Sequence, residues 1–142
     1  MEGGRRLKTS HGFGVTVDNA SNYQYHGSLF LGSDRQEMSF ILDTGSSWMW
    51  IPDYQCPLEE CSGFRYNSAE SDTFKKSSKM IDIVYGRGYV EGYLAEDQIT
   101  YMKEPSANRQ IADKMHFLVV YHAQELEGLV SDGLLGLAPK AA

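Results

Sequence analysis

The sequence predicts an all-β protein. Apolar and polar residues alternate in five segments: residues 23–31, 38–42, 81–85, 90–94 and 115–121. Alternation with a period of two is typical of a strand that buries one face. No segment keeps a 3.6-residue apolar period for three turns, so no long amphipathic helix is expected. The 14 glycines indicate many tight turns between the strands.

The first two segments predict a β-hairpin. Residues 32–34, with the sequence Gly-Ser-Asp, are typical of a turn and separate the strand over 23–31 from the strand over 38–42. The second strand leads directly into Asp43. We therefore expect Asp43 at the end of a buried strand.

The next two segments predict a second hairpin with its tip at Arg87, which has a glycine on each side. Residues 115–121 predict one further strand. The segments 62–79 and 103–109 are polar and rich in turn-forming residues. We expect both to be surface connections rather than linkers between domains.

Length and composition indicate one soluble domain. A chain of 142 residues is long enough to bury a core of its own. The net charge of −6 argues against binding to a nucleic acid, because such proteins usually present a basic face. The first eight residues lack the apolar segment of a signal peptide, and no stretch approaches the length of a membrane span.

No metal site is expected from the histidines and cysteines. A zinc site would need histidines, because the chain has only two cysteines. The histidines show no metal-ligand spacing; they are His11, His26, His116 and His122. No metal or organic cofactor is implied.

The two cysteines, Cys56 and Cys61, lie in one short loop after Pro52. Two interpretations stay open for them: a disulfide that closes a small ring, or a pair of reduced thiols. Spacing alone does not separate the two, because disulfides depend on the redox compartment as well as on geometry.

The Asp-Thr-Gly-Ser sequence at residues 43–46 has a chemical and a structural interpretation. A carboxylate at the end of a buried strand is partly desolvated, and neighbouring hydroxyl groups can hold its oxygens. A glycine two residues later lets the backbone approach closely. Such a carboxylate suits acid–base catalysis. For a bare Asp-Thr-Gly, however, an aspartate that caps the turn after a strand is the commoner outcome.

Four segments favour the chemical interpretation when they are taken together. Residues 40–47 read Phe-Ile-Leu-Asp-Thr-Gly-Ser-Ser, and Trp-Ile-Pro follows at residues 50–52. Two cysteines enclose a short loop over 56–61, a glycine-tipped hairpin spans 83–97, and residues 132–138 read Asp-Gly-Leu-Leu-Gly-Leu-Ala. In order and spacing these segments resemble the first active-site motif, the disulfide loop, the flap and the threading segment of pepsin-like aspartic proteases.

The resemblance runs from about Tyr23 to Pro139 and implies one lobe of a bilobal aspartic protease, with a β-hairpin flap. It implies that residues 1–22 are an N-terminal extension and first strand region, and that residues 23–142 are an incomplete N-terminal lobe. It also implies that the cysteines form a disulfide. A disulfide in turn implies a secretory, vacuolar, lysosomal or extracellular location, although the chain shows no signal peptide.

Roles in the active site follow from the resemblance. Asp43 is one of two catalytic aspartates that share a proton and an attacking water, and Ser46 hydrogen-bonds its outer oxygen. Thr44 braces the catalytic loop against its counterpart loop, and Gly45 gives the backbone room. Trp50 supports the loop from the following strand.

The resemblance also implies how substrate is held. The hydroxyl of Tyr85, on the flap, lies near Trp50. The backbone N–H groups of Gly86 and Arg87 bind the substrate backbone, with Gly88 completing the flap tip. Arg87 replaces the small hydroxyl residue usual between the two glycines. Ile41 and Leu134 line an apolar pocket beside the scissile bond, and core packing stays an equally open role for both.

No second Asp-Thr-Gly or Asp-Ser-Gly follows Asp43, although this chemistry needs two carboxylates. Three interpretations follow. The chain supplies the N-terminal lobe of an aspartic-type endopeptidase that cleaves peptides or proteins, and is inactive without a second lobe or chain carrying the other aspartate. Alternatively, it is a catalytically inactive lobe that serves as a structural or binding subunit of a larger assembly. Finally, two copies of Asp43 meet across a twofold axis.

Overall fold

Strands are almost the only regular secondary structure in the described residues, so the prediction of an all-β fold is confirmed. The computed structural model describes residues 5–7, 15–20, 24–61, 63–85, 88–101, 110–125 and 131–139. In these ranges the only helix is the short 3-10 helix η1 (Ser68–Glu70), and no helix is long and apolar enough to cross a membrane. The strands are β1 (Arg5–Leu7), β2 (Val15–Ala20), β3 (Gln24–Leu31), β4 (Gln36–Asp43), β5 (Met49–Pro52), β6 (Lys75–Val84), β7 (Tyr89–Thr100), β8 (Gln110–Gln124) and β9 (Gly133–Gly136).

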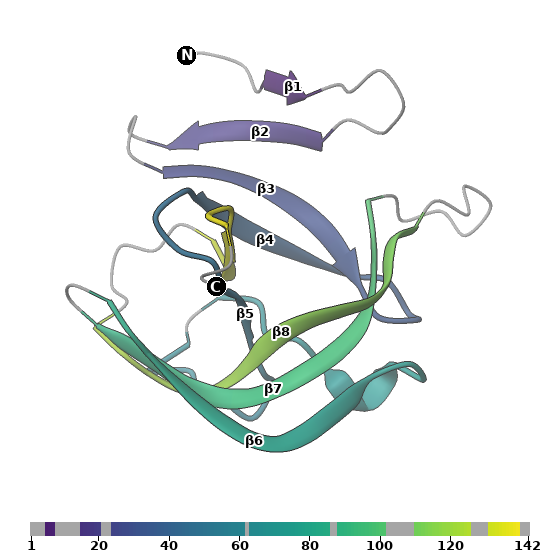
Figure 1. The fold of residues 1–142 in the computed structure, drawn as a ribbon, viewed down its shortest axis with the longest axis vertical. Helices are drawn as coiled ribbons and strands as arrows, with labels where there is room; N and C mark the ends of the chain where they lie inside the picture. The colour runs from purple at the N-terminus through teal and green to yellow at the C-terminus, as the bar shows by residue number, and fades with distance from the viewer. Residues whose placement is uncertain are drawn as a thin grey trace.

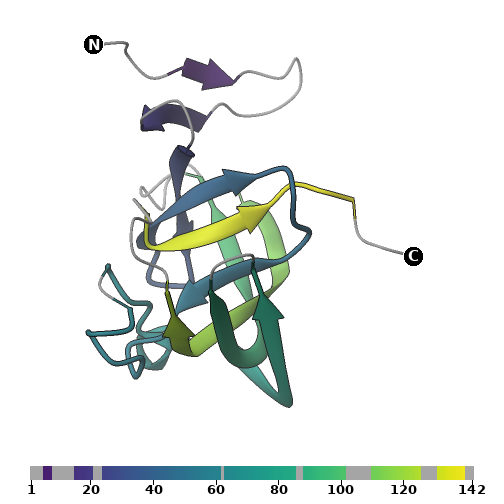
Figure 2. The ribbon, with the colours of Figure 1, turned by 90° about the vertical axis from the view of Figure 1, so that its left-hand side faces the viewer.

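The strands join in one sheet that curves back on itself (Figures 1 and 2). Their order is β1-β2-β3-β4-β9-β5-β8-β7-β6. The last two residues of β3, Phe30 and Leu31, also pair with Thr100 and Ile99 of β7. Figure 1 shows β3 and β4 in the upper half and β6, β7 and β8 in the lower half. The β3–β7 pairing therefore joins the two halves of the curved sheet.

Both predicted hairpins are present. β3 and β4 pair antiparallel across a turn that begins at Gly32, whose φ of +84° lies in the left-handed region that favours glycine. β6 and β7 pair antiparallel up to Val84 and Tyr89. The predicted tip, residues 86–87, lies outside the described residues. The strand predicted over 115–121 is part of β8.

One predicted connection is partly wrong. The segment 62–79 was expected to be a surface connection, but Lys75 begins β6, and Lys75 and Lys76 pair with Glu96 and Ala95 of β7. Every side chain from Lys75 to Met80 is exposed. An edge strand of this kind needs no apolar alternation, so the sequence pattern that predicts strands is absent. The other predicted connection, 103–109, lies outside the described residues.

Side chains pack in two clusters on opposite faces of the sheet. The buried residues of the first core are Leu31, Met38, Phe40, Met49, Ile51, Tyr66, Ala95, Ile99, Phe117 and Val119. The buried residues of the second core are Trp50, Cys56, Cys61, Val90, Leu118, Val120, Ala123 and Leu134. Partly buried side chains of the β6–β7 hairpin pack against the second core.

β9 lies between β4 and β5, although it follows every other strand in the sequence (Figure 2). It runs parallel to β4 and antiparallel to β5. A Cβ atom on Gly133 would lie 2.3 Å from the carbonyl oxygen of Trp50, and one on Gly136 would lie 2.5 Å from that of Ser46. Both positions therefore require glycine, because no side chain fits against the neighbouring backbone.

Candidate active site

Asp43 lies at the end of β4, beside the end of β9. The parallel register of these strands places Asp43 opposite Gly136. The chain turns directly after Asp43, and the amide of Gly45 donates a hydrogen bond to Asp43 Oδ1 at 2.9 Å. The Asp43 side chain is half-buried. A carboxyl group at a strand end is thus held in a tight turn by its own side-chain hydrogen bond.

Backbone hydrogen bonds fasten this turn to the end of β9. The amide of Leu137 donates to the carbonyl oxygen of Asp43 at 2.7 Å. The amides on either side of it donate to the carbonyl oxygens of Trp48 and Ser46, at 2.8 and 2.9 Å. Residues 43–48 are therefore fixed through their backbone. Asp43 Oδ2 has no hydrogen bond in the part of the chain that the structure describes.

Ser46 does not make the contact that the resemblance implies. Its Oγ is buried and has no hydrogen-bond partner among the described residues, so it does not bond to Asp43. The amide of Gly45 is the donor to Asp43 Oδ1, and the amide of Ala138 donates to the carbonyl oxygen of Ser46, which fixes the Ser46 backbone. Thr44 and Gly45 are both exposed on the same turn.

The β6–β7 hairpin contacts the core beside Asp43 through Tyr85 and Trp50. Trp50 Nε1 donates a hydrogen bond to the hydroxyl oxygen of Tyr85 at 2.8 Å. Trp50 is 1% exposed, and Tyr85 is half-buried. Burial raises the pKa of the Tyr85 hydroxyl above its ordinary value of 10, and the bond from Trp50 lowers it by less. The hydroxyl therefore stays protonated at neutral pH, with its oxygen turned to the indole.

Replacing Tyr85 with phenylalanine is expected to lower the free energy of unfolding by about 1–2 kcal/mol, because the buried indole N–H of Trp50 loses its acceptor. Urea unfolding followed by circular dichroism measures the loss. Tyr54→Phe is the matched control, since its hydroxyl accepts only an exposed bond of 3.3 Å from Gln55. Equal losses in the two variants would contradict the expected role of the Trp50–Tyr85 bond.

The tip of the hairpin is only partly described. Gly86 and Arg87 lie outside the described residues, so their contacts with substrate stay predictions. Gly88 accepts a hydrogen bond from the amide of Tyr85 at 2.7 Å. A Cβ atom on Gly88 would lie 2.2 Å from the carbonyl oxygen of Gln124, so the hairpin passes against the end of β8 with no room for a side chain.

Ile41 and Leu134 are neighbours in the parallel register of β4 and β9. They are 8% and 7% exposed. Paired residues share a face of the sheet, and Leu134 belongs to the second core together with Trp50. The structure therefore gives Leu134 a packing role, and a pocket role for either residue stays a prediction.

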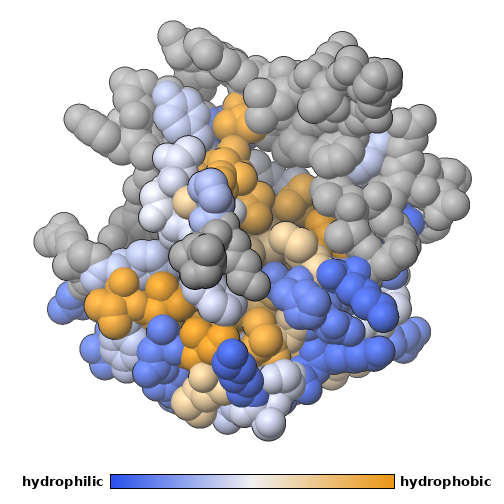
Figure 3. Space-filling model, viewed as in Figure 1, coloured by the Kyte–Doolittle hydropathy of each residue, from blue (hydrophilic) through white to orange (hydrophobic). Residues whose placement is uncertain are grey.

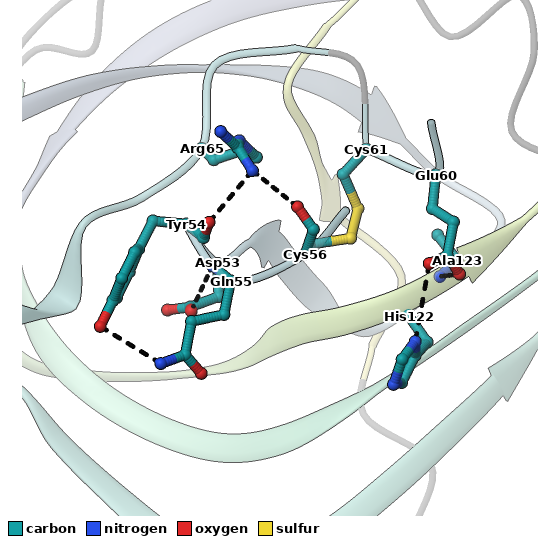
Figure 4. Close-up of a disulfide and its surroundings, with 9 residues drawn as sticks. All are labelled: Asp53, Tyr54, Gln55, Cys56, Glu60, Cys61, Arg65, His122 and Ala123. Atoms are coloured by element: carbon teal, nitrogen blue, oxygen red, sulfur yellow. Dashed lines mark hydrogen bonds and ion pairs between the residues drawn. A yellow bond between two sulfur atoms is a disulfide. The ribbon is translucent and has the colours of Figure 1, made fainter. Parts of the chain in front are cut away.

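Cys56 and Cys61 form a disulfide, with their Cα atoms 6.0 Å apart (Figure 4). The prediction of a disulfide is thus confirmed over the alternative of reduced thiols. Both cysteines are buried in the second core, the core that contains Trp50. The small ring therefore packs against the same cluster as the hairpin that covers Trp50.

Polar contacts hold the disulfide loop on both sides. Arg65 Nη1 donates to the carbonyl oxygens of Tyr54 and Cys56, at 3.0 and 2.7 Å. On the other side, Glu60 Oε2 lies 3.7 Å from His122 Nδ1 on β8 (Figure 4). The loop is thus attached to the chain that follows it and to the neighbouring strand.

Asp53 is fully buried beneath this loop. It accepts hydrogen bonds from the amide of Gln55 at 2.9 Å and from Ser68 Oγ at 3.4 Å. Burial raises the pKa of its carboxyl group above the ordinary 3.8, and the bond from Gln55 only partly offsets this. The folded state therefore favours the neutral carboxyl group of Asp53. The stability that this neutral group contributes is fully present below pH 3.8 and is lost as the pH rises through the raised pKa.

Asp53→Asn is expected to gain stability relative to the wild type as the pH rises from 3 towards 7, because asparagine stays neutral. Its carbonyl oxygen can accept the bond from the Gln55 amide, and its NH2 group can donate to Ser68 Oγ. Urea unfolding of both proteins across this range measures the difference. Asp72→Asn serves as the control, since Asp72 is exposed. A difference that stays constant with pH, or that falls, would contradict the raised pKa.

Asp132 links distant segments, although its place in the sequence indicates only a part of the threading segment. Its Oδ2 accepts bonds from the amide and the hydroxyl of Ser39 on β4, at 2.9 and 3.0 Å. Its Oδ1 accepts a bond from the amide of Phe64 at 2.8 Å, and its own amide donates to Ser39 Oγ at 3.0 Å. Asp132 thus joins β4, β9 and the segment after the disulfide loop. The alternation over residues 38–42 already accounts for a polar Ser39, so no local signal in the sequence points to this role of Asp132.

Asp97 on β7 carries another buried carboxyl group, and this residue is 1% exposed. Its Oδ2 accepts hydrogen bonds from the hydroxyls of Tyr66 and Ser71, the second at 2.8 Å. Its Oδ1 accepts bonds from Thr73 Oγ1 at 2.5 Å and from the amide of Gln98 at 2.8 Å. Burial raises the pKa of the Tyr66 hydroxyl well above 10, and the bond to Asp97 raises it further. Asp97 therefore ties the segment before β6 to β7.

Comparison with known proteins identifies the family. The sequence model of the eukaryotic aspartyl proteases matches residues 24–142. The chain belongs to this family. Among the relatives of this aspartyl protease chain, renin of Echis ocellatus is 42% identical over 84 residues, which cover 57% of the chain and 21% of that protein. Plasmepsin IV of Plasmodium falciparum is 30% identical over 131 residues, covering 89% and 28%.

Cathepsin D of Mus musculus is 28% identical over 138 residues, which cover 92% of this aspartyl protease chain and 34% of that protein. The chain thus spans between a fifth and a third of the length of these relatives. The match begins at residue 24, so β1 and β2 precede the matched region.

Proposed function

We propose that the chain supplies the N-terminal lobe of an aspartic-type endopeptidase, with Asp43 as one of two catalytic aspartates. The observation that carries this proposal is the turn after β4. Backbone bonds fix residues 43–48, while Asp43 Oδ2 has no hydrogen bond among the described residues. Thr44 and Gly45 are exposed beside it, where a facing lobe has access. Membership of the family supports the proposal.

In the proposed mechanism, Asp43 meets a second carboxyl group carried by another lobe or chain. Two carboxyl groups that lie so close together do not both ionise, so they share one proton. One takes a proton from the attacking water, while the other protonates the carbonyl oxygen of the peptide. The 142-residue chain alone is therefore inactive. No metal or organic cofactor takes part.

The proposed substrate is a peptide or protein bound in an extended conformation under the β6–β7 hairpin, which acts as a flap. Backbone N–H groups of Gly86 and Arg87 bind its backbone, as strand edges bind extended peptides. Ile41 and Leu134 line the pocket beside the scissile bond. The disulfide favours a secretory, vacuolar, lysosomal or extracellular location, because such bonds persist in oxidising compartments.

The test is peptide cleavage by the chain alone and by a chimera in which the second lobe of mouse cathepsin D follows residue 142. Fluorogenic peptides are assayed from pH 3 to 8 over a range of protein concentrations. We expect no cleavage by the chain alone. We expect cleavage by the chimera that is greatest at acidic pH, because the pair must share one proton, and that is abolished by Asp43→Asn.

Other outcomes assign the chain differently. Cleavage by the chain alone that grows with the square of its concentration and needs Asp43 would indicate a pair formed by two copies. A chimera that is folded by circular dichroism but inactive would favour the second candidate, a catalytically inactive structural or binding lobe. The unpartnered hydroxyl of Ser46 favours that candidate, because it leaves Asp43 without the support that the resemblance implies. A rate that rises steadily towards alkaline pH would refute the aspartic mechanism.

A further inference from the structure

β6 is the last strand at one end of the sheet, so its outer edge pairs with no strand of the described residues (Figure 1). An open edge presents unpaired N–H and C=O groups and is a template for pairing with another chain. Proteins often protect such edges with charge, and the first half of β6 carries Lys75, Lys76 and Lys79. The second half, residues 80–84, carries one charge, Asp82. We call residues 80–84 the hairpin edge.

The hairpin edge also exposes large apolar side chains. Val84 is 81% exposed and Met80 is 53% exposed. Figure 3 shows apolar surface among hydrophilic surface on the lower half of the molecule, where β6 and β7 run. In the register with β7, Met80 is paired with Tyr93 and Val84 with Tyr89. The exposed Met80 and Val84 thus lie beside two half-buried tyrosines on the neighbouring strand.

The backbone of the hairpin edge is directed for pairing on its outer side. The amide of Tyr85 donates to the carbonyl oxygen of Gly88, so the polar groups of Tyr85 face β7. In an antiparallel pair, successive residues bond alternately to one side and to the other. The register is regular from Met80 to Val84. The N–H and C=O groups of Met80, Asp82 and Val84 therefore point away from the sheet.

The sequence of the hairpin edge, Met-Ile-Asp-Ile-Val, is nearly the same in both directions. We propose that the hairpin edge pairs antiparallel with the hairpin edge of a second copy of this chain, about a twofold axis at Asp82. Met80 then lies opposite Val84 of the second copy, and Ile81 lies opposite Ile83. A pairing of this kind is closed, so it gives a dimer and not a filament.

The dimer satisfies groups that are open in one copy. Three facing pairs of residues exchange two hydrogen bonds each, about six in all. Across the junction, Tyr93 and Met80 of one copy continue into Val84 and Tyr89 of the other, which makes one apolar row. Cross-strand apolar and aromatic pairs of this kind stabilise a sheet. An unrelated extended peptide would not offer both the apolar row and the outward backbone groups that a second copy offers.

Charge at the centre weakens the pairing. The two copies of Asp82 face each other, and Glu91 of β7 is paired with Asp82 on the inner side. Glu91 is in turn paired with His122 of β8, the next strand in the sheet. Like charges directly opposite each other are destabilising. Removing the charge of Asp82 is therefore expected to tighten the dimer.

Sedimentation velocity over a range of concentrations tests the proposal on the 142-residue chain and three variants. We expect a monomer–dimer equilibrium whose Kd rises at least tenfold in Val84→Lys, because two lysines then enter the apolar row. Asp82→Asn should lower the Kd roughly two- to fivefold. Leu58→Lys is the control, because Leu58 is 60% exposed in the disulfide loop, and its Kd should be unchanged.

Several results would overturn the proposal. They are a wild-type chain that stays monomeric up to its solubility limit, assemblies that grow beyond a dimer, and equal weakening by Val84→Lys and Leu58→Lys. These results bear on the β6–β7 hairpin, which is also the proposed flap, and not on Asp43, which lies on the turn after β4.

Discussion

Replacing Asp97 with alanine is expected to lower the free energy of unfolding by about 4 kcal/mol. The substitution removes a buried acceptor and leaves the hydroxyls of Tyr66, Ser71 and Thr73 without the oxygens to which they donate. Unsatisfied buried donors are costly because they lose water without gaining a partner. For a chain of this size, the midpoint of thermal unfolding should fall by roughly 10 °C.

Thermal unfolding followed by circular dichroism measures this effect, and two further variants define its origin. Asp72→Ala changes an exposed aspartate that lies between Ser71 and Thr73 in the sequence and should leave the midpoint nearly unchanged. Asp97→Asn keeps one acceptor oxygen and should lose less than Asp97→Ala. If Asp97→Ala unfolded at the wild-type temperature, the cluster of hydroxyls around Asp97 would have no part in stability.

Gly136→Ala is expected to destabilise the fold by about 3 kcal/mol and to displace the turn that carries Asp43. A Cβ atom on Gly136 would lie 2.5 and 2.6 Å from the carbonyl oxygens of Ser46 and Trp48. Backbone atoms cannot rotate aside as a flexible side chain does, so β9 and the turn must separate. The bond from the Gly136 amide to Trp48 would then lengthen or break.

Urea unfolding measures the loss in Gly136→Ala, and amide hydrogen exchange at Trp48 and Leu137 measures the opening of the turn. Gly45→Ala is the matched control within the same turn, since its Cβ atom would meet only Asp43 Oδ1, at 3.3 Å. That variant should cost less than about 1 kcal/mol. Similar losses for the two variants would contradict a specific role for the close approach at Gly136.

Local patterns predict the hairpins and the position of Asp43 well. Alternation over residues 38–42 and the glycine two residues after Asp43 are enough to place a carboxyl group at a strand end. Both are properties of neighbouring residues. The lysines at the start of β6 show the limit of such patterns, because a strand with both faces in solvent carries no apolar period.

Contacts between distant segments are beyond a local pattern. Tyr66 and Asp97 are 31 positions apart, and Ser39 and Asp132 are 93 positions apart. Nothing near Asp97 in the sequence indicates that three hydroxyls from residues 66–73 surround it. Ser46 shows the same limit at the candidate site, where its backbone is held by Ala138, 92 positions away, and its hydroxyl has no hydrogen-bond partner among the described residues.

The position of β9 in the sequence decides when the candidate site can form during synthesis. β4 and β5 are translated early, but the strand between them begins at Gly133. Contacts between segments so far apart in sequence form slowly, because a long loop must close first. On the ribosome, the turn at Asp43 therefore lacks its backbone hydrogen bonds to residues 136–138 until those residues have left the exit tunnel. The candidate site is therefore completed only after the whole segment that links β5 to β9 has been made.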